Sequence, residues 1–365
     1  MAGIYVHVPF CHSKCFYCDF YSLASTARVD VYAGALAREW EARRGELGGE
    51  SVTTLYFGGG TPSILRPDVF SRLAALFPLQ KVDEFTIEVN PEDVSEAAAE
   101  SWLKAGVNRV SMGVQSLDDA ELRAVGRRHT AAQALEAVRT LRRAGICNIS
   151  GDLIYGLPGQ TVESWRESLR SLLGSGITHL SAYCLSFEQG TRLYRMREKG
   201  EVAEQDDEVI EQMYGILCDE ARRAGMNHYE ISNFARPGME SRHNSSYWTG
   251  TPYLGLGPGA HSLGADGMRR FVPSNLNRWL ADPENAVERD EETATDRIND
   301  LILISLRTAR GLDLGALDAD AAARITRAAR PHVLSGNLVE TGTHLVVPES
   351  RWLLCDSVIR DLFVD

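Results

Sequence analysis

The stretch IYVHVPFCHSKCFYC, residues 4–18, leads from a short apolar segment into three closely spaced cysteines. Ile4–Val8 is rich in β-branched and aromatic residues, so we expect a strand that runs directly into a loop holding Cys11, Cys15 and Cys18. The C-x3-C-x2-C spacing lets one loop present three thiolates, the usual ligands of iron–sulfur clusters. Three ligands for the four irons of a [4Fe–4S] cluster leave one iron open to another molecule.

The open iron suits the methionine amino and carboxylate groups of S-adenosylmethionine, whose sulfonium the cluster can cleave by electron transfer to give a 5′-deoxyadenosyl radical. Two alternatives remain from the residues alone. One is a zinc site with His7 or His12 as fourth ligand, and the other is three structural cysteines in a turn. The preceding strand and the glycine-rich and carboxylate segments downstream favour the cluster.

The rest of the N-terminal half alternates β-rich runs with helical patterns from Gly3 to about Gln189. The predicted strands are Ile4–Val8, Thr53–Phe57, Glu84–Val89, Arg109–Val114, Ile149–Tyr155 and His179–Leu185. The predicted helices are Val31–Arg44, Pro67–Leu76, Ser95–Ala105, Ala131–Ala144 and Val162–Leu173. Successive βα units predict an α/β fold with a parallel sheet covered by helices. A closed barrel needs eight units, so six predict a partial, open (β/α)6 barrel.

The chain then divides into a barrel domain (1–280), a polar, acidic linker (281–292) and a small C-terminal domain (293–365). A helix is expected over Asp206–Ala224, and residues 227–262 are rich in glycine, asparagine and aromatics. In the C-terminal domain we expect helices over Ala294–Arg310, Asp318–Ala329 and Ser350–Leu362, with a hairpin over Gly336–Val347. Helix, helix and hairpin in this order predict a winged-helix-like domain.

The charge and cysteine content limit the partners and the location. The net charge is −12, and residues 291–365 hold eight Lys and Arg against twelve Asp and Glu. Phosphate neutralisation supplies most nucleic-acid affinity, so we expect no nucleic-acid partner, and a winged-helix regulator is disfavoured. Seven cysteines, three of them within eight residues, do not resemble a disulfide framework. With no signal peptide and no apolar run of about 18 residues, we expect a cytoplasmic protein without a transmembrane segment.

Further candidate residues fall at the ends of predicted strands, which is where barrel sheets place their sites. Gly58-Gly59-Gly60-Thr61-Pro62 follows the second strand, and glycines let backbone groups approach a ligand closely. A tight structural turn is the alternative for this segment. The other candidates are Glu88, Gln115, Arg127 and Asp152, and for each of them an ordinary polar residue is the alternative.

Several of these segments together resemble a known family. They are residues 5–11 (YVHVPFC), the cysteine loop, GGGTP, IEVNP, MGVQS and DLIYGLPGQT. The chain is similar along most of its length to the radical S-adenosylmethionine family of oxygen-independent coproporphyrinogen III oxidase. The resemblance implies a partial barrel with a helical C-terminal domain. It also implies an S-adenosylmethionine pocket at Tyr5, Gly59, Gly60, Thr61, Glu88, Gln115, Arg127 and Asp152, with Tyr17 beside the cluster.

This family has two branches, and the sequence favours one of them. The decarboxylating oxidase continues its cysteine run as C-x2-C-x-C, whereas this chain reads Cys18-Asp19-Phe20. The oxidase also carries an N-terminal arm before the first strand, where this chain has only Met1–Gly3. The chain instead resembles the sister branch of heme chaperones. Coproporphyrinogen III oxidation is the alternative function.

The segment that resembles the chaperone branch is residues 243–248, HNSSYW, which matches its H-N-x-x-Y-W motif. The resemblance implies heme binding through His243, Asn244, Tyr247 and Trp248, with His243 as a candidate iron ligand. Imidazole ligates heme iron, and aromatic rings pack on a porphyrin face. His261 and His7 are competing ligands, and a turn with packed aromatics is the alternative reading. We expect a chaperone that passes heme to an apo-hemoprotein.

Overall fold

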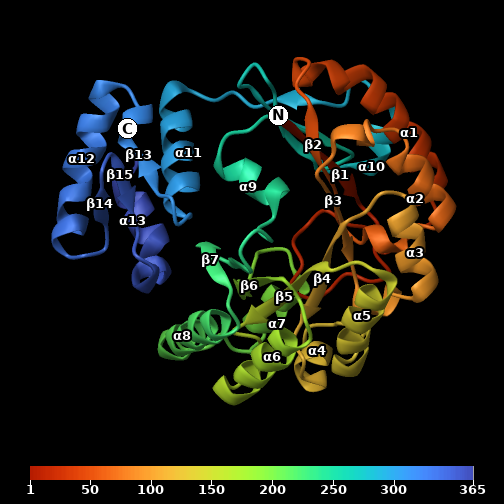
Figure 1. The fold of residues 1–365 in the computed structure, drawn as a ribbon, viewed down its shortest axis with the longest axis horizontal. Coiled ribbons are helices and arrows are strands. Elements are labelled where there is room, and N and C mark those ends of the chain that lie inside the picture. The colour runs from red at the N-terminus through yellow and green to blue at the C-terminus, as the bar shows by residue number, and fades with distance from the viewer. Residues whose placement is uncertain (365) are drawn as a thin grey trace.

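The six predicted strands form the centre of one sheet. The computed structural model describes residues 1–364 and places them in an α/β barrel domain and a C-terminal domain (Figure 1). The strands are β1 (Ala2–Val8), β2 (Val52–Gly59), β3 (Glu84–Val89), β4 (Arg109–Gln115), β5 (Asn148–Tyr155) and β6 (His179–Cys184). They pair in parallel in chain order. The predicted strands and their parallel order are therefore confirmed, with ends that differ by no more than two residues.

Six shorter strands extend this sheet at both edges. They are β7 (Asn227–Glu230), β8 (Asn233–Ala235), β9 (Tyr253–Leu256), β10 (His261–Leu263), β11 (Arg269–Phe271) and β12 (Glu288–Arg289). The strand order is β12-β11-β10-β9-β1-β2-β3-β4-β5-β6-β8-β7, and β9 pairs in parallel with β1. Within residues 1–364, β12 and β7 do not pair with each other. The sheet is therefore an open, partial barrel, as predicted.

Helices cover the outer face of the sheet (Figure 1). They are α1 (Val29–Arg43), α2 (Pro67–Ala74), α3 (Glu96–Lys104), α4 (Asp119–Ala124), α5 (Ala131–Ala144), α6 (Val162–Gly174) and α8 (Asp207–Arg223). Helix α7 (Arg192–Glu198) contacts the cysteine loop instead, where the Leu193 N–H donates to the Phe16 carbonyl at 2.7 Å. Short 3-10 helices span Arg44–Leu47, Pro62–Ile64, Leu79–Lys81 and Pro91–Asp93. The predicted helices are present, and several begin with side-chain caps, such as the capping box of Thr130 and Gln133 at α5. The short α4 and α7 were not predicted, because six or seven residues carry little periodicity.

The segment between the barrel and the C-terminal domain is more ordered than its composition indicates. Residues 227–262 include a short helix, α9 (Arg242–Trp248), and α10 (Leu276–Ala281) follows. The predicted linker 281–292 is not wholly a linker, because β12 lies inside it and pairs with β11. Backbone pairing, and not the polar side chains, decides the structure there.

The C-terminal domain contains α11 (Ala294–Leu306), α12 (Ala319–Leu334) and α13 (Cys355–Leu362) around a small antiparallel sheet. The sheet is β13 (Leu312–Asp313), β14 (Val339–Thr341) and β15 (His344–Val346), and 3-10 turns span Leu314–Ala316 and Glu349–Leu354. The order is winged-helix-like. Asp365 lies outside the described residues.

Three helix ends in this domain differ from the prediction. The last helix begins at Cys355 and not at Ser350, because residues Glu349–Leu354 form a 3-10 helix. α11 stops at Leu306, four residues early, because Arg307 and Ala309 form backbone hydrogen bonds with Ile231 and Tyr229 of the barrel domain, of 2.9 and 3.1 Å. α12 continues to Leu334 with Pro331 inside it. A proline removes one intrahelical hydrogen bond, and the helix tolerates this loss near its end. Among residues 1–364, no helix is both long enough and apolar enough to cross a bilayer.

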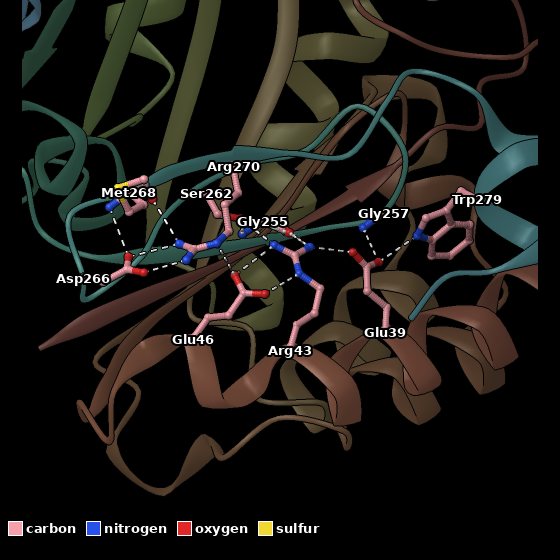
Figure 2. Close-up of polar contacts among 10 residues, drawn as sticks. All are labelled: Glu39, Arg43, Glu46, Gly255, Gly257, Ser262, Asp266, Met268, Arg270 and Trp279. Atoms are coloured by element: carbon pink, nitrogen blue, oxygen red, sulfur yellow. Dashed lines mark hydrogen bonds and ion pairs between the residues drawn. The ribbon is translucent and has the colours of Figure 1, made fainter. Parts of the chain in front are cut away.

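A buried ion pair fastens α1 to the added edge of the sheet (Figure 2). Arg43 donates to Glu39 at 2.7 Å, and the two side chains are 2% and 0% exposed. The Arg43 guanidinium also donates to the carbonyl of Gly255 at 3.0 Å, while Glu39 accepts from the Gly257 N–H and the Trp279 indole, both at 2.8 Å. The polar groups of both side chains have hydrogen-bond partners, so neither charge is left uncompensated. The pair therefore connects the first helix to β9 and α10.

We predict that Arg43→Met lowers the free energy of unfolding by about 3–5 kcal/mol, because it leaves the Glu39 carboxylate buried without its partner. Urea denaturation followed by circular dichroism measures this loss. The matched control is Arg44→Met, since Arg44 pairs with Glu41 on the exposed face of the same segment. It should cost no more than about 1 kcal/mol. A loss below about 1 kcal/mol for Arg43→Met would contradict the prediction.

Candidate functional site

A cavity of about 430 Å³ opens at the carboxyl ends of the parallel strands. Most of the residues predicted for the cluster and for S-adenosylmethionine line it, although they come from six separate segments. They are Cys11, Cys15, Tyr17, Cys18, Gly59, Gly60, Thr61, Glu88, Gln115, Arg127 and Asp152. Parallel strands direct their carboxyl ends to one edge of the sheet, which is why residues far apart in sequence meet here.

The cysteine loop is held at its base by backbone hydrogen bonds. The Cys11 N–H donates to the Leu23 carbonyl at 2.9 Å, and the Leu23 N–H donates to the Pro9 carbonyl at 2.8 Å. The Gly60 N–H donates to Val8 at 2.9 Å, and the Thr61 N–H donates to Phe10 at 2.7 Å. These bonds fix where the loop leaves β1 and where it returns.

The three thiols face the cavity with donors beside them. Thr61 Oγ1 donates to Cys11 Sγ at 3.3 Å, and Arg127 Nη1 donates to Cys15 Sγ at 3.4 Å. Burial raises the pKa of Cys18 to about 11, so the free thiol is protonated and iron binding releases its proton. Three convergent sulfurs with hydrogen-bond donors to two of them fit a cluster ligated by three cysteines.

The zinc alternative loses both of its candidate fourth ligands, His7 and His12. His7 has both ring nitrogens engaged, with the Tyr5 hydroxyl at 3.1 Å and the Tyr21 carbonyl at 2.9 Å. His12 pairs with Asp93 at 3.1 Å. Neither histidine belongs to the residues that line the cavity. The geometry therefore favours the cluster over zinc.

The glycines after β2 are required by close contacts. A Cβ on Gly60 would lie 2.7 Å from the carbonyl oxygens of Val8 and Phe10. Gly59 has φ +100°, and a Cβ there would lie 2.5 Å from the His7 ring. The segment is thus a tight structural turn, the alternative reading from sequence, and it also lines the cavity with backbone.

Glu88 is a half-buried acid of the cavity. Its carboxylate accepts from the Gly59 N–H at 3.0 Å and from the Tyr56 hydroxyl at 2.8 Å. Burial, with the nearby Asp152 charge, raises the pKa of Glu88 to about 7. Near neutral pH this carboxyl is therefore present in both its protonated and its charged form. This property suits a side chain that binds an ammonium or a hydroxyl group.

The three remaining polar candidates converge on the same space. Asp152 accepts from Ser111 Oγ at 3.3 Å, and burial raises its pKa. Arg127 donates to Asn90 Oδ1 at 2.8 Å. Gln115 is the one non-glycine residue within residues 1–364 with a positive φ, 69°. Such backbone strain collects at functional sites.

Tyr5 does not line this cavity. Its ring lies deeper in the barrel, 5.9 Å from Tyr56 and 6.4 Å from His243 between ring centroids, and its hydroxyl contacts His7. Tyr5 therefore contacts residues next to the pocket. Its predicted contact with S-adenosylmethionine stays a prediction.

The HNSSYW segment lies at the opposite end of the barrel, on α9. The Glu84 carboxylate, at the start of β3, accepts from the backbone N–H groups of Arg242 and His243 at 2.9 and 3.0 Å. Thr54, near the start of β2, contacts His243 Nδ1 at 2.8 Å. α9 therefore covers the amino ends of the strands and faces α11 (Figure 1).

His243 is 1% exposed, and both of its ring nitrogens have partners. Nδ1 lies 2.8 Å from Thr54 Oγ1, and Nε2 lies 2.8 Å from the Tyr247 hydroxyl. Burial lowers the pKa of His243 to about 3, so the ring is neutral at physiological pH. Iron ligation by His243 stays a prediction, and it requires the loss of one of these two contacts.

The other members of the motif are more accessible. Asn244 and Trp248 are half-buried, and Trp248 Nε1 is a buried atom without a hydrogen-bond partner among the described residues. His261, a competing ligand, is exposed on β10 and stacks on Phe271. Two histidines therefore remain candidate ligands of heme iron: His243, which is buried, and His261, which is exposed.

Sequence reasoning did not name several residues of the cavity. Tyr183 and Cys184 end β6, and Asn90 follows β3. The signal that could have found them is their position at the carboxyl ends of predicted strands. Tyr183 and Cys184, for example, lie near the end of the strand predicted over His179–Leu185. Phe20, which replaces the oxidase's further cysteine, also lines the cavity and is 65% exposed.

The comparisons with known proteins agree with this geometry. Residues 5–172 match the model of the radical SAM superfamily. The chain is 35% identical to the heme chaperone HemW of Lactococcus lactis over 84% of this chain and 82% of that protein. It is 36% identical to the protein of the same name from Mycobacterium tuberculosis over 99% of this chain and 94% of that one.

Among solved structures, the coproporphyrinogen III oxidase HemN from Escherichia coli has a TM-score of 0.85 at 24% identity, covering 100% of this chain and 90% of that one. This likeness shows a common fold. The fold and the cysteine-lined cavity are those of a radical SAM protein, a class that implies a [4Fe–4S] cluster and S-adenosylmethionine. Within that class, the chain belongs to the HemW family.

We predict that anaerobic reconstitution yields about four irons per chain with the broad visible absorbance of a cluster. Replacing Cys11, Cys15 and Cys18 together with alanine should abolish both. Cys184→Ser is the matched control, because Cys184 lines the same cavity. Iron analysis and absorbance spectra decide the outcome. Loss of the cluster in Cys184→Ser, with retention in the triple variant, would refute the loop assignment.

Proposed function

We propose that this chain is a heme chaperone, which binds heme and delivers it to an apo-hemoprotein. The observation that carries the proposal is the 36% identity with a protein named heme chaperone HemW along 94% of that protein's length. The HNSSYW segment supports it, because it supplies imidazole and two aromatic rings on one short helix.

In this proposal the cavity holds the cluster and S-adenosylmethionine. Cys11, Cys15 and Cys18 would ligate three irons. The cluster supplies one-electron reducing power and an open iron. The backbone at Gly59 and Gly60, with Glu88, would receive polar groups of S-adenosylmethionine, and Arg127 keeps a positive charge beside the Cys15 sulfur.

Heme is proposed to bind at α9, on the side of the barrel away from the cluster. The unpartnered indole N–H of Trp248 offers a donor for a polar group of the porphyrin edge. His243 would become a ligand when Nε2 exchanges the Tyr247 hydroxyl for iron, since the other nitrogen can keep Thr54. A hydrogen bond on the distal ring nitrogen of a ligand histidine fixes its tautomer and raises its basicity.

Coproporphyrinogen III oxidation is the competing function. The fold shared with HemN favours it, whereas Phe20 offers no sulfur at the position of the oxidase's further cysteine. The aromatic side chain lines the cavity and is largely exposed. An exposed phenyl ring there cannot act as an additional ligand.

We predict no conversion of coproporphyrinogen III to protoporphyrinogen IX by the reconstituted protein with reductant and S-adenosylmethionine. The same preparation should bind heme and transfer it to an apo-hemoprotein. Chromatography of the porphyrins and heme absorbance of the separated proteins measure the two outcomes. Turnover of about 0.1 s⁻¹ or more, together with no heme binding, would overturn the chaperone proposal in favour of the oxidase.

We predict opposite effects at two residues of α9. His243→Ala should diminish or shift the heme Soret band with iron–sulfur content unchanged, because it removes the ligand. Tyr247→Phe keeps the ring and frees Nε2, so it should leave the band intact and tighten heme binding. Heme titration measures both variants, and His261→Ala tests the competing ligand. An unaltered spectrum and affinity in His243→Ala, with loss in His261→Ala, would transfer the assignment to His261.

A further inference from the structure

A second cleft, of about 350 Å³, lies where the barrel domain meets the C-terminal domain. Three potential metal ligands line it, and each comes from a different element. Cys218 lies on α8, His228 on β7, and Glu349 begins the 3-10 turn before α13. None of them belongs to the cluster cavity or to α9. The cleft therefore lies between the two domains.

The ligand atoms of the three side chains converge. His228 Nδ1 lies 3.0 Å from Glu349 Oε1 and 4.0 Å from Cys218 Sγ, and all three atoms lie within 4.8 Å of one another. Ligands of a tetrahedral zinc ion at the usual bond lengths are separated by roughly 3.3–3.8 Å. Cys218 Sγ must therefore move inward by about 1 Å, whereas His228 Nδ1 and Glu349 Oε1 separate by a few tenths of an ångström.

His228 can ligate a cation through Nδ1 in one of its two neutral tautomers. Its Nε2 lies 3.4 Å from the Ile231 carbonyl, which accepts but cannot donate. When Nε2 carries the proton, Nδ1 presents a lone pair toward the lone pairs of Glu349 Oε1. A metal ion removes that repulsion, and a backbone carbonyl on the other nitrogen is the usual support of a ligand histidine. In the other tautomer the Nδ1–H of His228 donates to Glu349 Oε1 at 3.0 Å, and metal binding replaces that hydrogen bond.

Surrounding residues hold the ligands in place. The His228 ring lies between Phe234 and Trp352, with centroid distances of 3.9 and 4.0 Å. Arg222 donates to Glu349 Oε2 at 3.0 Å, which leaves Oε1 directed at His228. The guanidinium lowers cation affinity by its charge, yet it also orients the carboxylate. Glu349 is half-exposed, so water has access to a fourth position.

We propose that Cys218, His228 and Glu349 bind Zn²⁺, with water as the fourth ligand. The N, S and O donors suit this borderline-soft ion, and three protein ligands plus water is a common zinc arrangement. On binding, the Cys218 thiol releases its proton to solvent and the thiolate bonds to zinc. Because Glu349 belongs to the C-terminal domain, the ion clamps that domain onto α8 and β7.

The test is a Co²⁺ titration of the full chain carrying Cys11→Ser, Cys15→Ser and Cys18→Ser, so that the cluster loop offers no thiolate. One Co²⁺ per chain should give tetrahedral d–d absorption and a sulfur-to-cobalt charge-transfer band, and Zn²⁺ should displace it. Adding Cys218→Ser should abolish the charge-transfer band. Adding Glu349→Gln, on the exposed rim, should weaken binding by about tenfold or more.

Matched variants separate the site from unspecific binding. Cys147→Ser removes an exposed thiol elsewhere, and Arg222→Ala removes the charge beside Glu349 without removing a ligand. Both should retain the cobalt spectrum. Zn²⁺ should also raise the thermal midpoint of the parent chain by more than that of Glu349→Gln at the same zinc concentration. No charge-transfer band in the parent, or a band that survives Cys218→Ser, would overturn the proposal. If Cys218→Ser fails to fold, an unchanged affinity in Glu349→Gln overturns it.

Discussion

The backbone hydrogen bonds between the turn after β2 and the end of β1 hold the candidate site together. Gly60 and Thr61 donate to Val8 and Phe10, and a side chain at position 60 would collide with those same carbonyls. The cysteine loop begins at that point, and its first sulfur accepts from Thr61. The same turn supplies the N–H that donates to Glu88. One close approach of two strands therefore positions the cysteine loop, the glycines and the Glu88 carboxylate relative to one another.

The barrel presents two different chemical environments at its two ends. Thiols, a strained glutamine and half-buried carboxyls line the carboxyl end, whereas α9 covers the amino end with a neutral, hydrogen-bonded histidine. Tyr56 lies between them, since its hydroxyl donates to Glu88 and its ring stacks on His243 at 5.1 Å. A single side chain therefore contacts both the acid of the cavity and the histidine of α9.

The open edges of the sheet explain how the remaining chain is arranged. A closed barrel has no free strand edge, whereas this one must satisfy two. At one edge β9–β12 continue the sheet and the Glu39–Arg43 pair anchors them to α1. At the other, β8 and β7 continue it, and backbone bonds from Ile231 and Tyr229 lead into the C-terminal domain. That domain therefore packs beside the open edge and near α9 (Figure 1).

The local pattern of residues was sufficient for the parallel strands, for the long outer helices and for most members of the cluster cavity. The periodic spacing of apolar residues is a feature of short stretches of sequence. The carboxyl ends of parallel strands lie at one edge of a sheet regardless of their side chains. The tertiary structure alone decided the place of Tyr5, the burial of His243 and the strand inside the predicted linker, because each depends on partners more than fifteen residues away. It also decided the convergence of Cys218, His228 and Glu349. Their spacing along the chain carries no motif, and only the packing of one domain on the other brings Glu349 to the imidazole.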